Sequence, residues 1–177
     1  MGAVELVERL AGAQIGQTFN QFASSELCRA RLREHLVDRA GAPFVLVGEA
    51  AGFRGARVSG IAFTSERQLT GTGPAEATAT IVHRVLVEIG IEDDVLLWNV
   101  VPTHPGTPIS NRRPTREEIR DSRPFLAEVV RGRRAIAIGR LAAEALGAPY
   151  VRHPSHGGAQ AFADGLRRRL AEAANAG

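Results

Sequence analysis

A short apolar run that stops at a glycine constrains the fold of this chain more than any other feature. Residues 44–47 are all apolar, and a glycine-rich loop over 48–66 follows them directly. An apolar run of this length closed by glycine predicts a buried strand that ends in an irregular loop. In proteins that alternate strands with helices, ligands bind at the loops that follow the carboxyl ends of the strands. We therefore expect the 48–66 loop to form part of a site.

Three further apolar runs have the composition of strands, and the stretches between them have the apolar spacing of helices. Strands are predicted at 95–101, 134–139 and 149–152, and helices at 4–11, 26–39, 75–89, 115–132, 141–146 and 159–174. Strands that alternate with helices, without internal repeats or linkers, are typical of the α/β class. We expect a single domain over residues 1–177.

Local signals refine this assignment. Ser25 is placed to cap the helix that follows it, and Thr115 forms a capping box with Glu118. The four prolines and one glycine of segment 102–114 predict a loop without regular structure. Pro124 predicts a kink or a restart in the helix that begins after Thr115.

The positive charge of the chain comes from arginine alone. All 22 basic residues are arginines, the net charge is +3 and the pI is about 10.3. Because arginine binds phosphate through two N–H groups at once, this composition is compatible with a polyanionic partner. For most of these arginines, a solvated helix face and a bias in genome composition are the simpler explanation.

The remaining composition limits the class of protein. A chain of 177 residues with 44% hydrophobic composition is long enough to bury a sizeable core. No apolar run approaches the length that crosses a bilayer, and the first residues include acids where a signal peptide is basic. Cys28 is the only cysteine, which excludes an internal disulfide and a cluster held by four thiolates. We expect a cytoplasmic protein without a membrane segment.

The glycine-rich loop resembles the first motif of the uracil-DNA glycosylase superfamily. Residues 48–52 (Gly-Glu-Ala-Ala-Gly) are similar to the Gly-Glu-x-Pro-Gly of its iron–sulfur type, with alanine in place of proline. Residues 60–64 resemble the Gly-Leu-Ser-Phe-Ser of the archetypal enzymes, whose Phe stacks on the extruded base. The resemblance implies a three-layer α/β/α sandwich around a mostly parallel four-stranded sheet, and it implies that Phe63 stacks on a base. A place for Phe63 in the core is the alternative.

Two later residues stand where the superfamily places base-contacting groups. Asn99 interrupts an apolar strand, so its amide is either paired with backbone or contacts a ligand. The resemblance favours the ligand, because superfamily members use an Asn here to bind the Watson–Crick edge of uracil. His153 begins a His-Pro-Ser sequence like the second motif, whose His contacts the uracil oxygen. A metal bound by His153 and His156 is the weaker reading, since the chain offers no further ligands nearby.

The resemblance assigns roles to further residues. Glu49 and His153 are the predicted catalytic pair. The predicted base-binding residues are Gly48, Ala50, Gly52, Phe63 and Asn99. The predicted DNA-binding residues are Arg57, Arg112, Arg113, Ser155, His156, Gly157 and Gly158.

Three departures from the archetypal pattern bear on mechanism. Ala50 stands where those enzymes have a water-activating Asp, and Gly52 aligns with the Tyr that excludes thymine. Gly157 aligns near the Leu wedge that fills the space left by the flipped base. The sequence leaves His156, Arg112 and Arg113 as candidate wedges, and it leaves the range of bases open.

The sequence therefore predicts a monomeric glycosylase that acts on DNA containing uracil or another deaminated base. The chain has no lysine to form a Schiff base, so the enzyme is expected to be monofunctional. No cofactor or metal is expected, because the cysteines of the iron–sulfur type are missing. A lesion-binding module without turnover and an enzyme or binder of small nucleosides are the alternatives.

Overall fold

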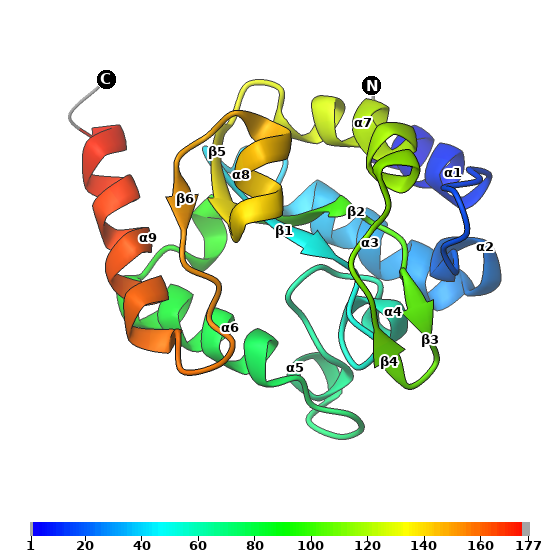
Figure 1. The fold of residues 1–177 in the computed structure, drawn as a ribbon, viewed down its shortest axis with the longest axis horizontal. Coiled ribbons are helices and arrows are strands. Elements are labelled where there is room, and N and C mark those ends of the chain that lie inside the picture. Colours follow the sequence, from blue (N-terminus) through cyan, green and yellow to red (C-terminus); the bar gives the residue numbers. More distant parts are fainter. Residues whose placement is uncertain (1, 175–177) are drawn as a thin grey trace.

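A parallel sheet forms the centre of the molecule in a computed structural model that describes residues 2–174. The strands β1 (Phe44–Ala50), β2 (Val95–Val101), β5 (Arg134–Ile138) and β6 (Tyr150–Val151) pair in the order β2-β1-β5-β6. Each of the three pairings is parallel. The predicted α/β class and the four-stranded sheet are confirmed (Figure 1).

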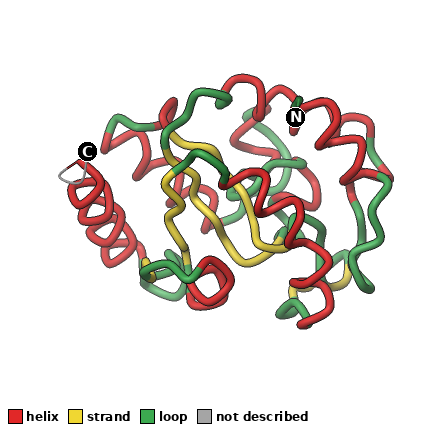
Figure 2. The backbone as a smooth tube through the Cα atoms, turned by 90° about the horizontal axis from the view of Figure 1, so that it is seen from above, coloured by secondary structure: helices red, strands yellow, loops and turns green. Residues whose placement is uncertain are grey.

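Helices cover both faces of this sheet and make the three layers expected (Figure 2). One face packs against α1 (Ala3–Ala11), α2 (Gln21–Ser24), α3 (Glu26–Asp38), α7 (Arg116–Val130) and α8 (Arg140–Leu146). The other face packs against α6 (Ala77–Ile89) and α9 (Ala159–Ala174). The shorter elements are α4 (Ala56–Ser59), α5 (Glu66–Thr70), the 3₁₀ turn η1 (Glu92–Asp94) and the hairpin strands β3 (Gly106–Thr107) and β4 (Ser110–Asn111).

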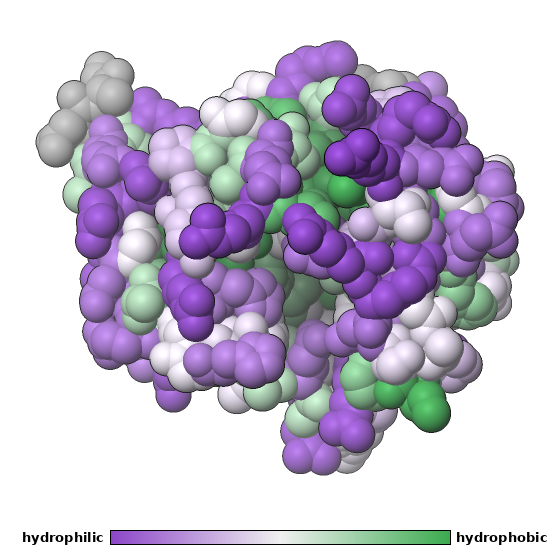
Figure 3. Space-filling view, in the orientation of Figure 1, coloured by the Kyte–Doolittle hydropathy of each residue, from purple (hydrophilic) through white to green (hydrophobic). Residues whose placement is uncertain are grey.

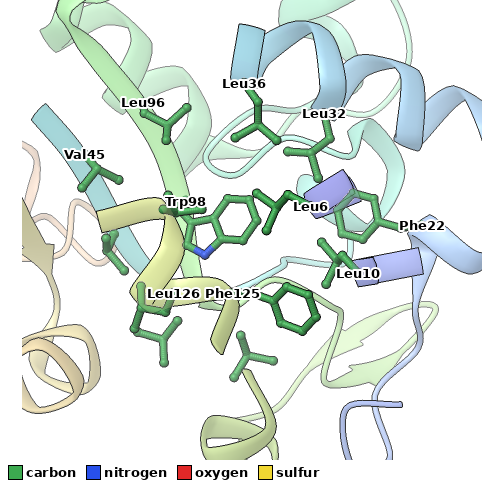
Figure 4. Packing of buried hydrophobic residues seen from close by; sticks show 14 of the residues in the cluster. Leu6, Leu10, Phe22, Leu32, Leu36, Val45, Leu96, Trp98, Phe125 and Leu126 are labelled. Carbon is green, nitrogen blue, oxygen red and sulfur yellow. The ribbon is translucent and has the colours of Figure 1, made fainter. Parts of the chain in front are cut away.

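Side-chain alternation along the strands divides the core in two. In β2, Leu96 and Trp98 join the cluster under α1, α3 and α7, whereas Val95 and Leu97 join the cluster under α6 and α9. Figure 4 shows the indole of Trp98 surrounded by apolar side chains from the helices of the first cluster. Asn99 is next in this alternation, so its amide lies on the α6 and α9 face.

The predicted helix starts are confirmed by their hydrogen bonds. The Ser25 hydroxyl accepts from the backbone N–H of Cys28 at the start of α3. At the start of α7, the Thr115 hydroxyl accepts from the N–H of Glu118, and the Glu118 carboxylate accepts from the N–H of Thr115. Each such cap is worth roughly 1 kcal/mol of stability.

Two local predictions were wrong, and a third was wrong in part. β1 continues three residues beyond Val47, because its pairing with β2 extends through Gly48 and Ala50. Segment 102–114 contains the antiparallel hairpin β3–β4, whose paired residues fall between the prolines. α7 does not restart at Pro124, because Phe125 and Leu126 beside it are anchored in the core and outweigh one lost backbone hydrogen bond.

Within residues 2–174, none of the helices combines the length and the apolar character needed to cross a bilayer.

Candidate active site

A cleft of about 530 Å³ opens at the carboxyl ends of the strands, where the α/β architecture places ligand sites. It lies between the hairpin β3–β4, the start of α6 and the loop that follows β6 (Figure 1). The surface is hollowed in this region (Figure 3). Among the predicted site residues, those that line the cleft are Glu49, Ala50, Gly52, Phe63, Asn99, Arg112, His153, Ser155 and His156.

The floor of the cleft depends on a glycine at position 48. A Cβ at Gly48 would lie 2.5 Å from Cζ of Phe63 and 2.6 Å from Oδ1 of Asn99, closer than real contacts allow. Gly48 therefore supplies the space in which the ring and the amide meet. Phe63 adopts a left-handed backbone conformation (φ +53°), which a non-glycine residue holds only where its surroundings enforce it. Its ring is 7% exposed and lines the cleft.

The Asn99 amide has no hydrogen-bond partner among the residues that the structure describes. The residue is 5% exposed and borders the cleft. Its amide atoms are not among the buried polar atoms that lack a partner, so the amide reaches the surface of the cleft. An amide that is open to a cleft and unpaired within the protein is free to bind a ligand, so the structure favours the ligand-contact reading of Asn99 over the backbone-paired one.

The hydrogen bonds of His153 identify the ring nitrogen that carries its proton. Nδ1 lies 3.2 Å from the backbone N–H of Ser155 and 2.8 Å from the Ser155 hydroxyl. A backbone N–H can only donate, so Nδ1 acts as an acceptor and the proton of the neutral ring sits on Nε2. Burial lowers the pKa of His153, and the charges of His156 and Arg152 lower it further. The neutral ring therefore offers an Nε2–H donor at neutral pH.

Two carboxyl groups line the cleft. Glu49 lies near the end of β1; burial raises the pKa of its carboxyl, and the charge of Arg113 opposes that shift. Glu76, directly before α6, was missed by the sequence analysis, and burial raises its pKa as well. A Cβ at Gly52 would lie 2.3 Å from Oε1 of Glu76, and a Cβ at Gly55 would lie 2.1 Å from Oε2. The Glu76 carboxyl thus fills the space that side chains at these positions would take.

The arginines predicted to bind DNA have different environments. Arg112 donates to both carboxylate oxygens of the buried Glu118, at 2.8 and 2.5 Å, and these hydrogen bonds lower the pKa of Glu118. Its guanidinium is therefore already occupied. The guanidinium of Arg57 lies over the ring of Phe19, 4.9 Å from the centroid. Arg113 is exposed. Neither Arg57 nor Arg113 lines the cleft.

The loop after β6 is closely folded around His153. A Cβ at Gly158 would lie 2.3 Å from the carbonyl oxygen of His153, so this position requires a glycine. Gly157 is exposed and has φ +74°, and His156 before it also has a positive φ of +52°. Neither Gly157 nor Gly158 lines the cleft. The Gly158 N–H already donates to the carbonyl oxygen of Ser155 at 3.1 Å, whereas Gly157 remains a predicted phosphate contact through its backbone N–H.

The described residues contain no group of three or more His, Cys, Asp or Glu side chains arranged to hold a metal ion. An iron–sulfur cluster does not fit this chain, because its one cysteine, Cys28, is buried in the core on α3 and contacts the carbonyl of Val58.

Comparisons with known proteins agree with this architecture. The model of the uracil DNA glycosylase superfamily matches residues 35–172, about three quarters of the chain. The crystal structure of wild-type SMUG2 from Pedobacter heparinus is similar, with a TM-score of 0.72, 12% sequence identity and 99% of each chain covered. No curated protein matches the sequence at a significant level. The chain belongs to the uracil-DNA glycosylase superfamily, a superfamily of DNA glycosylases.

Proposed function

We propose that this protein is a monofunctional DNA glycosylase that flips uracil, or another deaminated base, out of DNA and hydrolyses its N-glycosidic bond. The observation that carries the proposal is that two hydrogen-bonding groups without protein partners line the same cleft. The Asn99 amide lies at the cleft without a partner among the described residues, and the neutral His153 ring keeps an Nε2–H donor. Together they suit a flat heterocycle with polar edges.

The chemistry of base release matches the groups that line the cleft. Breaking an N-glycosidic bond leaves negative charge on the base and positive charge on the sugar. The His153 donor would stabilise the oxygen of the departing base, and the Glu49 carboxylate would stabilise the sugar or orient the attacking water. Phe63 would stack on the base. Water adds to the sugar carbon as the bond to nitrogen breaks, and no covalent enzyme intermediate is required.

Glu76 bears on the range of bases. Gly52 lacks the side chain by which archetypal enzymes exclude thymine, but the Glu76 carboxyl occupies the space beside it. We propose that Glu76 forms that wall of the base pocket, so that the methyl group of thymine meets a carboxyl instead of an aromatic ring. Uracil and other bases without this methyl group would fit.

Release of bases from labelled oligonucleotides tests the function. The substrates contain uracil, hypoxanthine, xanthine or a thymine mismatch, and alkali then cuts the abasic sites. We expect strand cleavage only after alkali, with uracil among the substrates, and much weaker cleavage by the His153→Ala variant. A band shift on uracil DNA without base release would identify a lesion-binding module. If the protein neither releases a base nor gives a salt-dependent band shift, action on DNA is overturned and small nucleosides are favoured.

A further inference from the structure

A flipped base leaves a gap in the stack, and the sequence did not identify the side chain that fills it. The structure weakens one candidate, because Glu118 holds the guanidinium of Arg112 by two hydrogen bonds. It also places His156 in the lining of the cleft, where the base itself would bind. The third candidate, Arg113, is exposed outside the cleft lining, and so is an apolar residue of the same segment, Ile109.

Ile109 is an unusually exposed apolar residue in the hairpin whose base lines the cleft. Its side chain is 82% exposed, whereas the next value among the large hydrophobic residues is 59%, for Val37. Val37 and several of the others lie on helices, but Ile109 lies in the turn between β3 and β4. Figure 3 shows a hydrophobic protrusion over this hairpin, beside the hollow of the cleft.

The hairpin is adjacent to the cleft and is uncharged where it would meet bases. Pro105, Asn111 and Arg112 at its base line the cleft. Residues 105–111 carry no charged side chain, so inserting the turn between bases would desolvate no ion. Exposed Arg113 lies two residues beyond this stretch and offers a cation for the flanking phosphates. This arrangement combines an apolar tip with a basic edge.

Several hydrogen bonds hold the hairpin rigidly against the first motif. The backbone N–H of Phe53 donates to Oδ1 of Asn111 at 2.9 Å. The two ring nitrogens of buried His104 lie 2.7 Å from the carbonyl oxygen of Ala51 and 2.8 Å from that of Thr107. The Thr107 hydroxyl is 2.7 Å from the Ser110 hydroxyl across the turn. An anchored tip loses little freedom when it enters DNA.

We propose that Ile109 is the wedge: on binding, its side chain enters the base stack of duplex DNA and fills the space left by the nucleotide flipped into the cleft. The inference rests on the proposed action on DNA and adds the side chain that opens the duplex. Apolar side chains that enter a base step stabilise an unstacked geometry whose cost is roughly a few kcal/mol. The wedge then stands on the opposite rim from the His153 loop.

The test compares duplex and single-stranded uracil oligonucleotides under single-turnover conditions. Ile109→Ala should slow excision from duplex about 10- to 100-fold, and from single strands by less than about threefold, because single strands need no unstacking. Ile109→Leu should restore most of the duplex rate. Val87→Ala is the matched control: Val87 is a 57%-exposed side chain on α6, outside the cleft lining, and its truncation should change neither rate.

A second readout needs no turnover. With 2-aminopurine beside the uracil, the wild-type protein should raise fluorescence on binding, and Ile109→Ala should raise it much less. An unchanged duplex rate with unchanged fluorescence, or equal losses on duplex and single strands, would overturn the wedge. Failure of the wedge proposal in this way would not affect base release by the wild type. If the wild type itself releases no base, the proposed function is refuted, and the fluorescence measurement alone tests the wedge.

Discussion

The face of the sheet under α1, α3 and α7 is closed, whereas the face under α6 and α9 borders the cleft at the carboxyl ends of the strands. Trp98 and Asn99 are neighbours in β2, and both are at most 5% exposed. Trp98 packs among side chains of α1, α3 and α7, whereas Asn99 faces the opposite side and meets no partner among the described residues. A step of one residue along the strand therefore changes a side chain from core to site.

The difference between these faces separates stability from activity. Side chains on the closed face are held by apolar contacts, and their loss is expected to destabilise the fold. Polar groups at the open end border the cleft, and their loss is expected to cost activity with little change in stability. The following variants test this separation, from the largest expected effect to the smallest.

Asn99 and Trp98 give the sharpest contrast. Asn99→Ala should lower uracil excision by about 100- to 1000-fold, as expected for the loss of one positioned hydrogen-bonding group, with an unchanged melting temperature. Trp98→Ala should instead lower the free energy of unfolding by about 3–5 kcal/mol through the cavity it leaves. Single-turnover kinetics and urea denaturation measure the two quantities. A strongly destabilised Asn99→Ala with normal kinetics would reverse the comparison.

Replacement of Glu49 should raise the stability of the protein but lower its rate of excision. Burial raises its carboxyl pKa, so the folded state favours the protonated form, and that stabilisation is lost as pH rises through the folded pKa. Glu49→Gln should therefore be more stable than the wild type at neutral pH, yet about 100-fold slower in excision.

The pH–rate profile checks the assignment of Glu49. The active form has Glu49 ionised and His153 neutral, so both groups must lose a proton as the pH rises. Burial raises the pKa of Glu49 above its ordinary value and lowers the pKa of His153 below its own. Excision should rise with pH and then level off, and the rise should be less steep in Glu49→Gln. An unchanged profile in the variant would remove Glu49 from the mechanism.

A variant of Gly48 tests whether the cleft depends on the close approach of Phe63 and Asn99 to the backbone at this position. Gly48→Ala places a methyl group against Phe63 and Asn99 and should lower excision about 10- to 100-fold, with about 1–3 kcal/mol of lost stability from overpacking. Gly41→Ala is the matched control, because a Cβ there would meet nothing within 4 Å. Equal behaviour of the two variants would show that the floor of the cleft is not tightly packed.

Glu76 is expected to have the smallest effect, on selectivity. Glu76→Ala empties the space beside Gly52 and should raise thymine excision relative to uracil by about tenfold, the scale of one methyl group in a pocket. Competition between mismatched thymine and uracil duplexes measures the ratio. A ratio that stays constant would place Glu76 outside the wall of the base pocket.

Sequence patterns predicted the features that depend on local chemistry. The β2 strand, the Thr115 capping box and the unusual Asn99 all follow from residues close together in the chain. The role of Glu76 could not be predicted, because only the folded chain brings it over Gly52, 24 positions earlier in the sequence. The pairing of Arg112 with Glu118 was hidden for a different reason: the capping-box pattern already accounted for Glu118.

The hairpin was missed because prolines normally interrupt strands. Here Pro105 and Pro108 flank the paired residues Gly106 and Thr107 and take no part in the pairing themselves. Its exposed tip, Ile109, carries no sequence signal of its own, since a single apolar residue in a loop is common. Only its exposure and its place beside the cleft distinguish it.

The most direct test of this account is a crystal structure of the Glu49→Gln variant bound to a uracil-containing duplex. The account predicts an extruded uracil with its edge at the Asn99 amide and its face on Phe63. It also predicts a base oxygen within hydrogen-bond distance of His153 Nε2, and Ile109 in the gap of the stack. A uracil that remains stacked in the duplex, or one bound outside the cleft at the strand ends, would contradict it.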